Sequence, residues 1–249
     1  MEIVGRGFIA KNLEPIADAH PDVVVLAAGV SRTTATSRAD FLRERRLVEE
    51  HVRRCQRDGR RLVFLSTAST GVYGSSTCDG REDTPVQPLS PYAAHKISLE
   101  HLLQNSAVDY LALRLSHLVG PHQRPWQLLP SLVAQVQAGR VQVRRGAQRD
   151  LLEVGDMRRI TDALLREKVV REVVNVASGQ PVAVERVVQH IEWRLGCTPV
   201  HDLVEVDEPS IIDVTKLRKL VPEVESMGFG PRYYCDVLDS YLGVPTGTH

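Results

Sequence analysis

Tyr92 and Lys96, in the segment SPYAAHK, are the pair of residues whose chemistry is most easily recognised. If the segment is helical, residues four apart share one face, so the phenol and the ammonium can meet the same ligand. A free phenol loses its proton at about pH 10, and a neighbouring cation favours the phenolate and brings proton exchange closer to neutral pH. The pair is therefore suited to general acid–base catalysis, with a solvent-facing helix pair as the alternative.

Hydroxyl side chains gather in the segment STASTGVYG, directly after an apolar run that predicts a buried strand. Open α/β sheets bind ligands at the carboxyl ends of their parallel strands. A serine at such a strand end can donate a hydrogen bond to a substrate oxygen as negative charge develops on it. The alternative is an ordinary role in capping turns for each of these hydroxyls, which belong to Ser66, Thr67, Ser69 and Thr70.

A glycine turn stands near the start of the chain, in VGRGFIA, between a short apolar segment and a predicted helix. Gly5 and Gly7 let backbone N–H groups approach a pyrophosphate at the positive end of the helix dipole. Alone this motif is weak, because a tight turn without a ligand looks the same. Its order with the small residues 27–29, the hydroxyl cluster and the Tyr/Lys helix strengthens it, since all four motifs fall at the ligand side of successive sheet units.

Strands and helices alternate along the first 120 residues. An apolar start and a helix to about His20 are followed by a strand in 21–31, an amphipathic helix in 39–59, a strand in 61–70, a helix in 90–106 and a strand in 109–121. This alternation predicts an α/β fold with a doubly wound, Rossmann-like parallel sheet.

The second half of the chain is less regular. We expect residues 1–120 to form a dinucleotide-binding core, to which a strand near 171–177 returns. Segments 126–139 and 181–196 have helical patterns. Residues 121–170 and 178–249 are expected to form a small substrate lobe and closing elements.

Composition excludes several classes of partner. The 31 basic and 31 acidic residues cancel, so no overall field recruits nucleic acid or an anionic membrane. Four widely spaced cysteines indicate neither a disulfide framework nor a metal site. Charged residues interrupt the first 28 positions, so we expect no signal peptide, no membrane span and a cytoplasmic protein.

Taken together, these segments resemble the extended short-chain dehydrogenase/reductases, the NAD(P)-dependent group of sugar-nucleotide epimerases, dehydratases and ketoreductases. The similarity covers nearly the whole chain and rests on GRGFIA, DVVVLAAGVS, FLSTASTGVYG, SPYAAHKISLEHLL, LRLSHLVGP, RDLLEVGDMRR and VVNVASGQPVAVERVV. It implies an oxidoreductase that binds a nicotinamide dinucleotide.

Carried over residue by residue, the resemblance implies that Ser69, Tyr92 and Lys96 are catalytic, with Lys96 holding the nicotinamide ribose. In a reduction, Tyr92 would protonate the carbonyl oxygen while Ser69 hydrogen-bonds it. The predicted cofactor contacts are Gly5, Arg6, Gly7, Phe8, Ile9, Ala27, Ala28, Gly29, Arg32, Ser66, Thr67, Tyr92, Lys96, Leu115 and His117. The predicted substrate contacts are Ser69, Tyr92, His117 and Arg124.

Departures from the family pattern bear on the cofactor and the reaction. A strand, helix and strand that the family has before DVVVLAAG are absent, and Val4 replaces the first glycine of the turn. The acidic residue expected about 20 positions beyond the turn, for the adenosine ribose, is also absent. Arg6 and Arg32 can instead face a 2′-phosphate, which favours NADP(H) over NAD, although both can be plain surface arginines. His117 replaces an asparagine that borders the sugar in the family.

The leading hypothesis is an NADP(H)-dependent ketoreductase acting on a nucleotide-activated deoxysugar, in antibiotic or surface-glycan biosynthesis. The alternatives are a 4-epimerase or dehydratase with tightly bound NAD, and a non-catalytic dinucleotide-sensing protein. The helices at 39–58 and 92–105 resemble those through which the family pairs, so a homodimer is expected. One arginine is expected to clamp a substrate diphosphate, from among Arg124, Arg144, Arg145 and Arg149.

Overall fold

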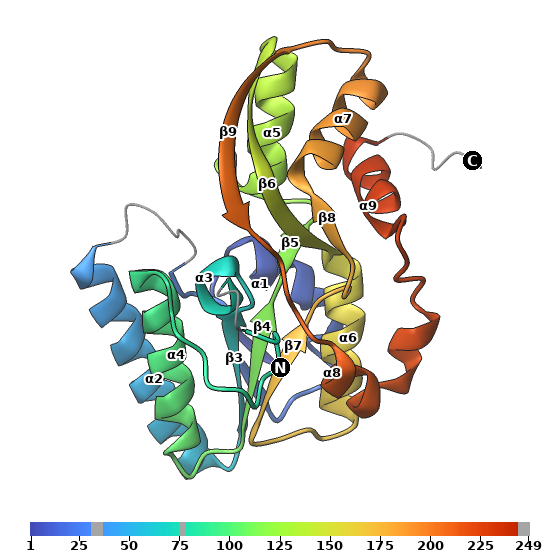
Figure 1. The fold of residues 1–249 in the computed structure, drawn as a ribbon. Helices are drawn as coiled ribbons and strands as arrows, with labels where there is room; N and C mark the ends of the chain where they lie inside the picture. Colours follow the sequence, from blue (N-terminus) through green and yellow to red (C-terminus); the bar gives the residue numbers. More distant parts are fainter. Residues whose placement is uncertain (31–36, 75–77, 244–249) are drawn as a thin grey trace.

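The computed structural model describes residues 1–30, 37–74 and 78–243 (Figure 1). Its main body is a five-stranded parallel sheet in the order β1-β2-β3-β4-β7. The strands are β1 (Glu2–Val4), β2 (Val23–Leu26), β3 (Arg61–Thr67), β4 (Tyr110–Leu115) and β7 (Glu172–Val176). The predicted α/β, Rossmann-like class is confirmed, and β7 is the strand that was expected to return to the sheet.

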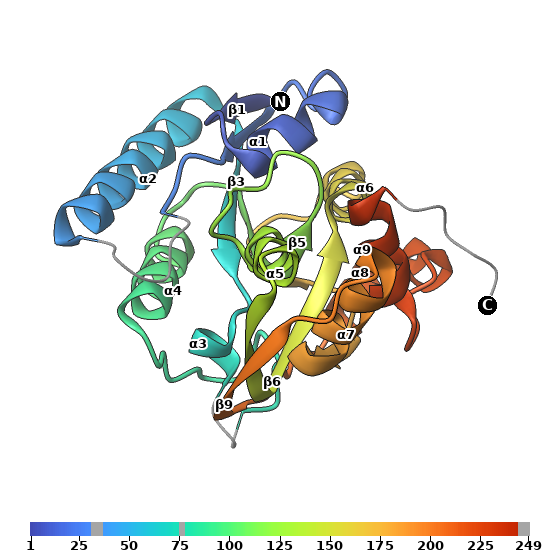
Figure 2. The ribbon, with the colours of Figure 1, turned by 90° about the horizontal axis from the view of Figure 1, so that it is seen from above.

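Helices cover both faces of this sheet, which explains why its strands are apolar throughout. Val23 and Val25 of β2 belong to the apolar core on one face, and Val24 and Leu26 belong to the core on the other. The first face packs against α1 (Phe8–Leu13) and α6 (Val154–Arg166), and the second packs against α2 (Arg38–Asp58) and α4 (Pro91–Gln104). Figure 2 shows α2 and α4 on the opposite side of the strands from α6.

The first connection of the sheet, from β1 to β2, differs in hand from the second. It steps across the sheet in the same direction as the connection from β2 to β3, but α1 and α2 cover opposite faces. The two connections therefore have opposite hands, whereas about 98% of such crossovers are right-handed. As the sequence indicated, the strand, helix and strand of the family pattern do not occur between α1 and β2, and β1 is an edge strand of the sheet.

The first two helices differ in detail from their predictions. The predicted helix to about His20 ends at Leu13 and continues only as a 3-10 turn, η1 (Glu14–Ile16), because Pro15 has no N–H to donate. The predicted amphipathic helix is present as α2 and ends at Gly59, whose φ of 64° closes it. Its buried face, however, includes the polar residues Glu44 and His51, while Leu42 is exposed.

A second sheet lies beyond the carboxyl ends of the main strands (Figure 1). It contains β5 (His117–Val119), β6 (Arg140–Glu153), β8 (Pro181–Ala183) and β9 (Val200–Glu208). Of these, β6, β8 and β9 were not predicted, and β8 occupies the first three residues of the segment 181–196 that was predicted to be helical. The two predicted helices are present as α5 (Leu128–Gln137) and α7 (Val184–Leu195). The chain ends in α8 (Thr215–Leu220), η2 (Pro222–Ser226) and α9 (Tyr233–Leu242), followed by residues outside the described part.

The predicted division into a core and a substrate lobe stays a prediction. Helix α6, which falls in the predicted lobe segment 121–170, packs against α1 of the main sheet. Across the three described stretches, no helix combines the length and the apolar character needed to cross a bilayer.

The glycine turn after β1 allows a matched test. A Cβ on Gly5 would lie 2.4 Å from the Ala27 carbonyl oxygen, and its φ of 139° strains any other residue, whereas a Cβ on Gly7 would meet nothing within 4 Å. We therefore expect Gly5→Ala to lower the free energy of unfolding by about 2–3 kcal/mol. Gly7→Ala should change it by less than about 1 kcal/mol. Urea denaturation of both variants measures the difference, and equal losses would contradict the assigned backbone geometry.

Candidate active site

One cavity of about 1090 Å³ collects the residues predicted from the sequence. Its walls come from the segments that follow β1, β2, β3 and β4, so it opens at the carboxyl ends of these parallel strands. The lining includes Gly5, Arg6, Gly7, Phe8, Ile9, Ala27, Ala28, Gly29, Ser66, Thr67, Ser69, Tyr92, Lys96, Leu115, His117 and Arg124. Arg32 lies outside the described residues. The roles of these residues stay predictions, but their assembly around one space is a property of the fold.

The hydroxyl cluster follows β3 and leads into the short helix α3 (Thr70–Tyr73). Ser69 precedes α3 and its amide donates to the Thr67 hydroxyl at 3.2 Å. The Leu89 amide donates to the Gly71 carbonyl at 2.7 Å, which ties α3 to the segment that begins α4. Ser66 donates to Glu100 at 2.5 Å, so its hydroxyl is already engaged in a buried network.

Tyr92 and Lys96 lie in the first turns of α4, where Ser90 caps the helix by accepting from the Ala93 amide. Both side chains are buried, and the Lys96 Nζ is 5.8 Å from the centre of the Tyr92 ring. Burial raises the pKa of Tyr92, with Lys96 opposing that shift, Glu44 adding to it, and the Thr67 hydroxyl opposing it. The predicted solvent-facing alternative for this pair is therefore wrong.

Glu44 is a buried carboxylate at the site that the sequence analysis missed. Lys96 Nζ donates to Glu44 Oε1 at 2.7 Å and to the Leu65 carbonyl at 3.1 Å. The second carboxylate oxygen accepts from the Val30 amide at 3.1 Å and lies 3.0 Å from His95 Nε2. Burial by itself would raise the pKa of Glu44, but His95, Lys96 and the Val30 amide together lower it to about 2.

The Glu44 carboxylate leaves no room for a side chain at position 29. A Cβ on Gly29 would lie 2.1 Å from Glu44 Oε1 and 3.1 Å from Lys96 Nζ. A glycine is therefore required here for the carboxylate to reach the lysine. The sequence does contain a signal for this burial, because Glu44 precedes Val48, Val52 and Cys55 on the buried face of α2 at helical spacing.

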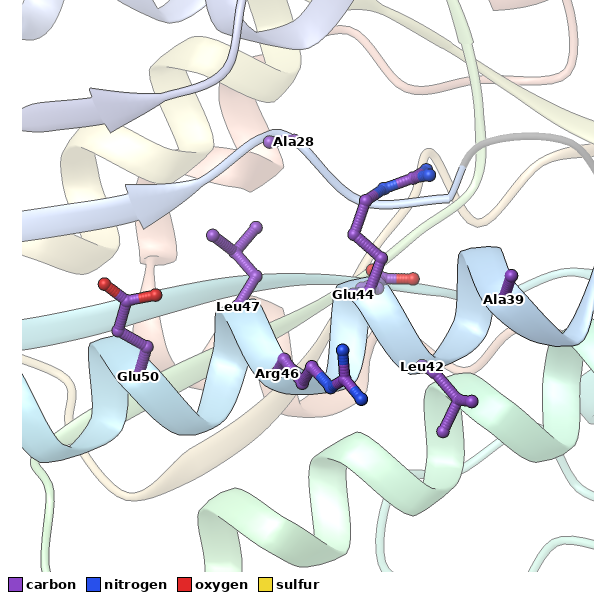
Figure 3. Close-up of a pocket in the computed structure, with 8 residues that line it drawn as sticks. Ala28, Ala39, Leu42, Glu44, Arg46, Leu47 and Glu50 are labelled. Atoms are coloured by element: carbon purple, nitrogen blue, oxygen red, sulfur yellow. The ribbon is translucent and has the colours of Figure 1, made fainter.

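Helix α2 also borders a second, open hollow of about 570 Å³ (Figure 3). Leu47 and Glu50 extend from the helix toward the turn that carries Ala28. Ala28 lines both this hollow and the main cavity, so the two spaces share the turn after β2 as a border.

The opposite wall of the main cavity is formed by the turn after β4 and by β6. Burial lowers the pKa of His117 to about 4, and the charge of Arg149 acts in the same direction, so the imidazole is neutral at physiological pH. Of the four arginines considered for a diphosphate, Arg124 and Arg149 line the cavity. Arg149 also pairs with Glu208 of β9 at 2.6 Å, as Arg144 does, and Arg145 pairs with Glu205.

A family model described as the NAD dependent epimerase/dehydratase family matches residues 9–177. The chain belongs to this family. The matched range begins at Ile9, so it does not contain Gly5 and Gly7 of the turn. It does contain the hydroxyl cluster, the Tyr/Lys helix and β7. It confirms the family predicted from the sequence motifs.

Named members of the epimerase/dehydratase family align with part of the chain. The uncharacterized UDP-glucose epimerase YtcB of Bacillus subtilis is 32% identical over 138 residues, which are 52% of this chain and 43% of the relative. The dTDP-glucose 4,6-dehydratase of Neisseria gonorrhoeae is 31% identical over 171 residues, which are 64% of this chain and 49% of the relative. The chain thus spans about half the length of the curated relatives it matches.

Solved structures show that the fold is shared over more of the chain. The structure of RMD from Pseudomonas aeruginosa complexed with NADPH has a TM-score of 0.78 at 19% identity, covering 97% of both chains. A UDP-galactose 4-epimerase structure has a TM-score of 0.77 at 20% identity, also covering 97% of both chains. At these identities the likeness supports the fold of the epimerase/dehydratase family and nothing finer.

The depressed pKa of Glu44 predicts a specific acid dependence of stability. Because the pKa is about 2 in the folded protein against 4.5 ordinarily, the ionised form stabilises the fold fully above about pH 4.5. That contribution is lost as the pH falls toward 2. We expect Glu44→Gln to cost about 3 kcal/mol at neutral pH and progressively less in acid. Urea denaturation across this range measures the difference, and a cost that is independent of pH would contradict the ion pair.

Proposed function

We propose that the protein is an NADP(H)-dependent ketoreductase that reduces a keto group of a nucleotide-activated deoxysugar. The observation that carries the proposal is that Ser69, Tyr92 and Lys96 line the same cavity as the glycine turn after β1. In this proposal Ser69 is a hydrogen-bond donor, Tyr92 is a proton donor and Lys96 is the ammonium that holds a ribose. The glycine turn forms another part of the same cavity wall.

The cavity suits a dinucleotide together with a phosphorylated substrate. Its volume of about 1090 Å³ exceeds the roughly 300–1,000 Å³ of a typical single-ligand pocket. A Cβ on Gly7 would have no neighbouring atom within 4 Å, so the turn leaves room for a pyrophosphate against the backbone. Among the described lining residues there is no aspartate or glutamate, whereas the cationic side chains are Arg6, Lys96, Arg124 and Arg149.

The choice of NADP(H) rests on that charge distribution. An acidic side chain that would accept from an adenosine ribose is not among the described lining residues, and Arg6 can pair with a 2′-phosphate. The family model is described as NAD dependent, and the similar RMD structure contains NADPH. NAD is therefore the alternative cofactor.

In the proposed reduction each residue has a separate task. The bound dinucleotide supplies the hydride that the carbonyl carbon receives. Tyr92 gives its phenolic proton to the carbonyl oxygen, which becomes a hydroxyl, and the resulting phenolate recovers a proton from water. Ser69 donates a hydrogen bond to the same oxygen while negative charge develops on it. Lys96 uses its free N–H to hold the nicotinamide ribose.

The substrate class rests on the far wall of the cavity and on the relatives. Guanidinium groups suit phosphate oxygens, which favours the cavity-lining residues Arg124 and Arg149 as contacts of a nucleoside diphosphate. Arg149 is also paired with Glu208, so Arg124 is the first choice. The relatives and similar structures are named for UDP- and dTDP-sugars. The proposal includes antibiotic or surface-glycan biosynthesis as the setting and the cytoplasm as the location. It also includes a homodimer that pairs through α2 and α4, and the exposed apolar side chain of Leu42 on α2 is consistent with such a contact.

Epimerisation or dehydration of the same kind of sugar is the second candidate. It is favoured by the names of the relatives, which are epimerases and dehydratases. Such an enzyme oxidises and then reduces its substrate, so its dinucleotide is regenerated in each cycle. A non-catalytic dinucleotide sensor is less consistent with the presence of Ser69, Tyr92 and Lys96 in one cavity.

The reductase and the epimerase differ in net cofactor use. We expect incubation with NADPH and UDP- or dTDP-4-keto-6-deoxy sugars to give steady loss of NADPH absorbance together with an equal amount of alcohol product. Interconversion of sugars without net loss of NADPH would contradict the reductase and support the epimerase.

Removing the Tyr92 hydroxyl tests the proton donor. We expect Tyr92→Phe to lower turnover by about 10²–10⁴-fold, because general acid catalysis is lost, while dinucleotide affinity changes little. Steady-state kinetics and a fluorescence titration with NADPH measure the two effects. Tyr241→Phe, in the distant helix α9, is the matched control and should retain turnover. Unchanged turnover in Tyr92→Phe would remove this residue from the mechanism.

A further inference from the structure

The ion pair between Glu44 and Lys96 is the feature that the proposed reaction leaves unexplained. Both residues are 3% exposed, and the two charged groups are 2.7 Å apart. Removing two charges from water is costly unless each is fully paired, so a pair at this depth acts as a unit without net charge. The ammonium beside Tyr92 is therefore not a free cation.

The hydrogen bonds of Lys96 also show how it is oriented. An ammonium has three N–H donors, and two of them are directed to Glu44 Oε1 and to the Leu65 carbonyl. One donor is left for the cavity that Lys96 lines. Glu44 thus decides which single N–H faces the ligand.

Glu44 is itself held so that it cannot turn away. Its Oε2 accepts from the Val30 amide and lies 3.0 Å from His95 Nε2. The His95 ring packs on the Phe41 ring, with 4.5 Å between the ring centres. The carboxylate therefore joins α2, α4 and the turn after β2 at one point.

The field at the Tyr92 hydroxyl follows from these contacts. A lone ammonium would favour the phenolate, but the adjacent carboxylate opposes it, and burial favours the neutral phenol. His95 is the other ionisable neighbour on α4, and a second buried ion pair joins Arg114 to Glu100 behind Ser66. Among the described residues of the cavity wall, the other ionisable groups are Arg6, His117, Arg124 and Arg149, of which Arg149 is paired with Glu208.

We propose that Glu44 is a positioning residue that neutralises Lys96 and keeps Tyr92 protonated, so that the resting site is set to give a proton to its substrate. The inference rests on the proposed function in that Tyr92 is taken as the proton donor. It also narrows that function. A reductase begins with a protonated phenol, whereas an epimerase or dehydratase begins with an oxidation, in which the phenol must first be deprotonated.

The protonation state of Tyr92 can be measured without cofactor or substrate. In protein labelled with ¹³C at the tyrosine ζ carbon, the Tyr92 resonance is the one that disappears in Tyr92→Phe, and its chemical shift distinguishes phenol from phenolate. We expect Glu44→Gln to lower the titration midpoint of Tyr92 by about one pH unit or more. Glu49→Gln, on the same helix and paired with exposed Arg45, is the matched control and should leave it unchanged. An unchanged midpoint in Glu44→Gln would overturn the proposal.

A second variant avoids leaving a buried charge without a partner. Glu44→Gln combined with Lys96→Met removes both charges, a change that buried ion pairs commonly tolerate. If the pair is neutral toward Tyr92, the midpoint should stay within about half a pH unit of the parent protein. A rise of about one unit or more would overturn the proposal, because Lys96 would then act as an uncompensated cation in the parent. Near-ultraviolet circular dichroism checks that each variant is folded.

The titration and the assay of turnover can fail separately. An absence of NADPH oxidation with every keto-sugar would contradict the proposed reductase but would leave the titration result unaffected. A midpoint that does not respond to Glu44 would contradict the positioning role even in an active reductase.

Discussion

The buried contact between Lys96 and Glu44 is the interaction on which the site depends. It joins the helix that carries Tyr92 to the long helix α2, and through the Val30 amide it also joins the turn after β2. Because an unpaired charge in this position would be costly, the three segments can pack only in an arrangement that brings the two charges together. Gly29 is part of the same constraint, since a side chain there would displace the carboxylate. This ion pair thus fixes the turn after β2 relative to helix α4, which carries Tyr92.

A second buried network supports the other side of the site. Arg114 of β4 donates to both oxygens of Glu100 and, at 2.5 Å, to the Tyr73 hydroxyl. Tyr73 in turn donates to Asn175 of β7, and Ser66 donates to Glu100. Two ion pairs on α4, one turn apart, therefore hold this helix to α2 through Glu44 and to β4 through Arg114. Lys96 of the first pair lines the cavity, whereas both members of the second pair are buried behind Ser66.

The edge position of β1 gives the cavity its asymmetry. On the side of β3 and β4, helices and the second sheet enclose the space with Tyr92, His117 and the arginines. On the side of β1 the sheet ends. The family pattern has a further strand, helix and strand at this point, and here β1 is instead connected directly to β2 through α1. The residues assigned to the nicotinamide half of a dinucleotide therefore lie in a built wall, whereas the adenosine half would meet the glycine turn, Arg6 and Ala28 at the open end.

The sequence by itself determined the parallel sheet, the order of its motifs and the family, because buried strands and their helices have strong local patterns. The Tyr92/Lys96 spacing and the hydroxyls after β3 were visible for the same reason: each depends on residues close together in the chain. Only the tertiary structure decided that Glu44, 52 residues before Lys96, is its partner, and that Arg144, Arg145 and Arg149 pair with acidic residues of β9. Charged residues on a helix normally face water, and although the spacing of Glu44 from Val48 and Val52 signals a buried position, it does not identify the partner that arrives from another helix. Its burial is decided by packing, which places in contact groups that the chain itself holds far apart.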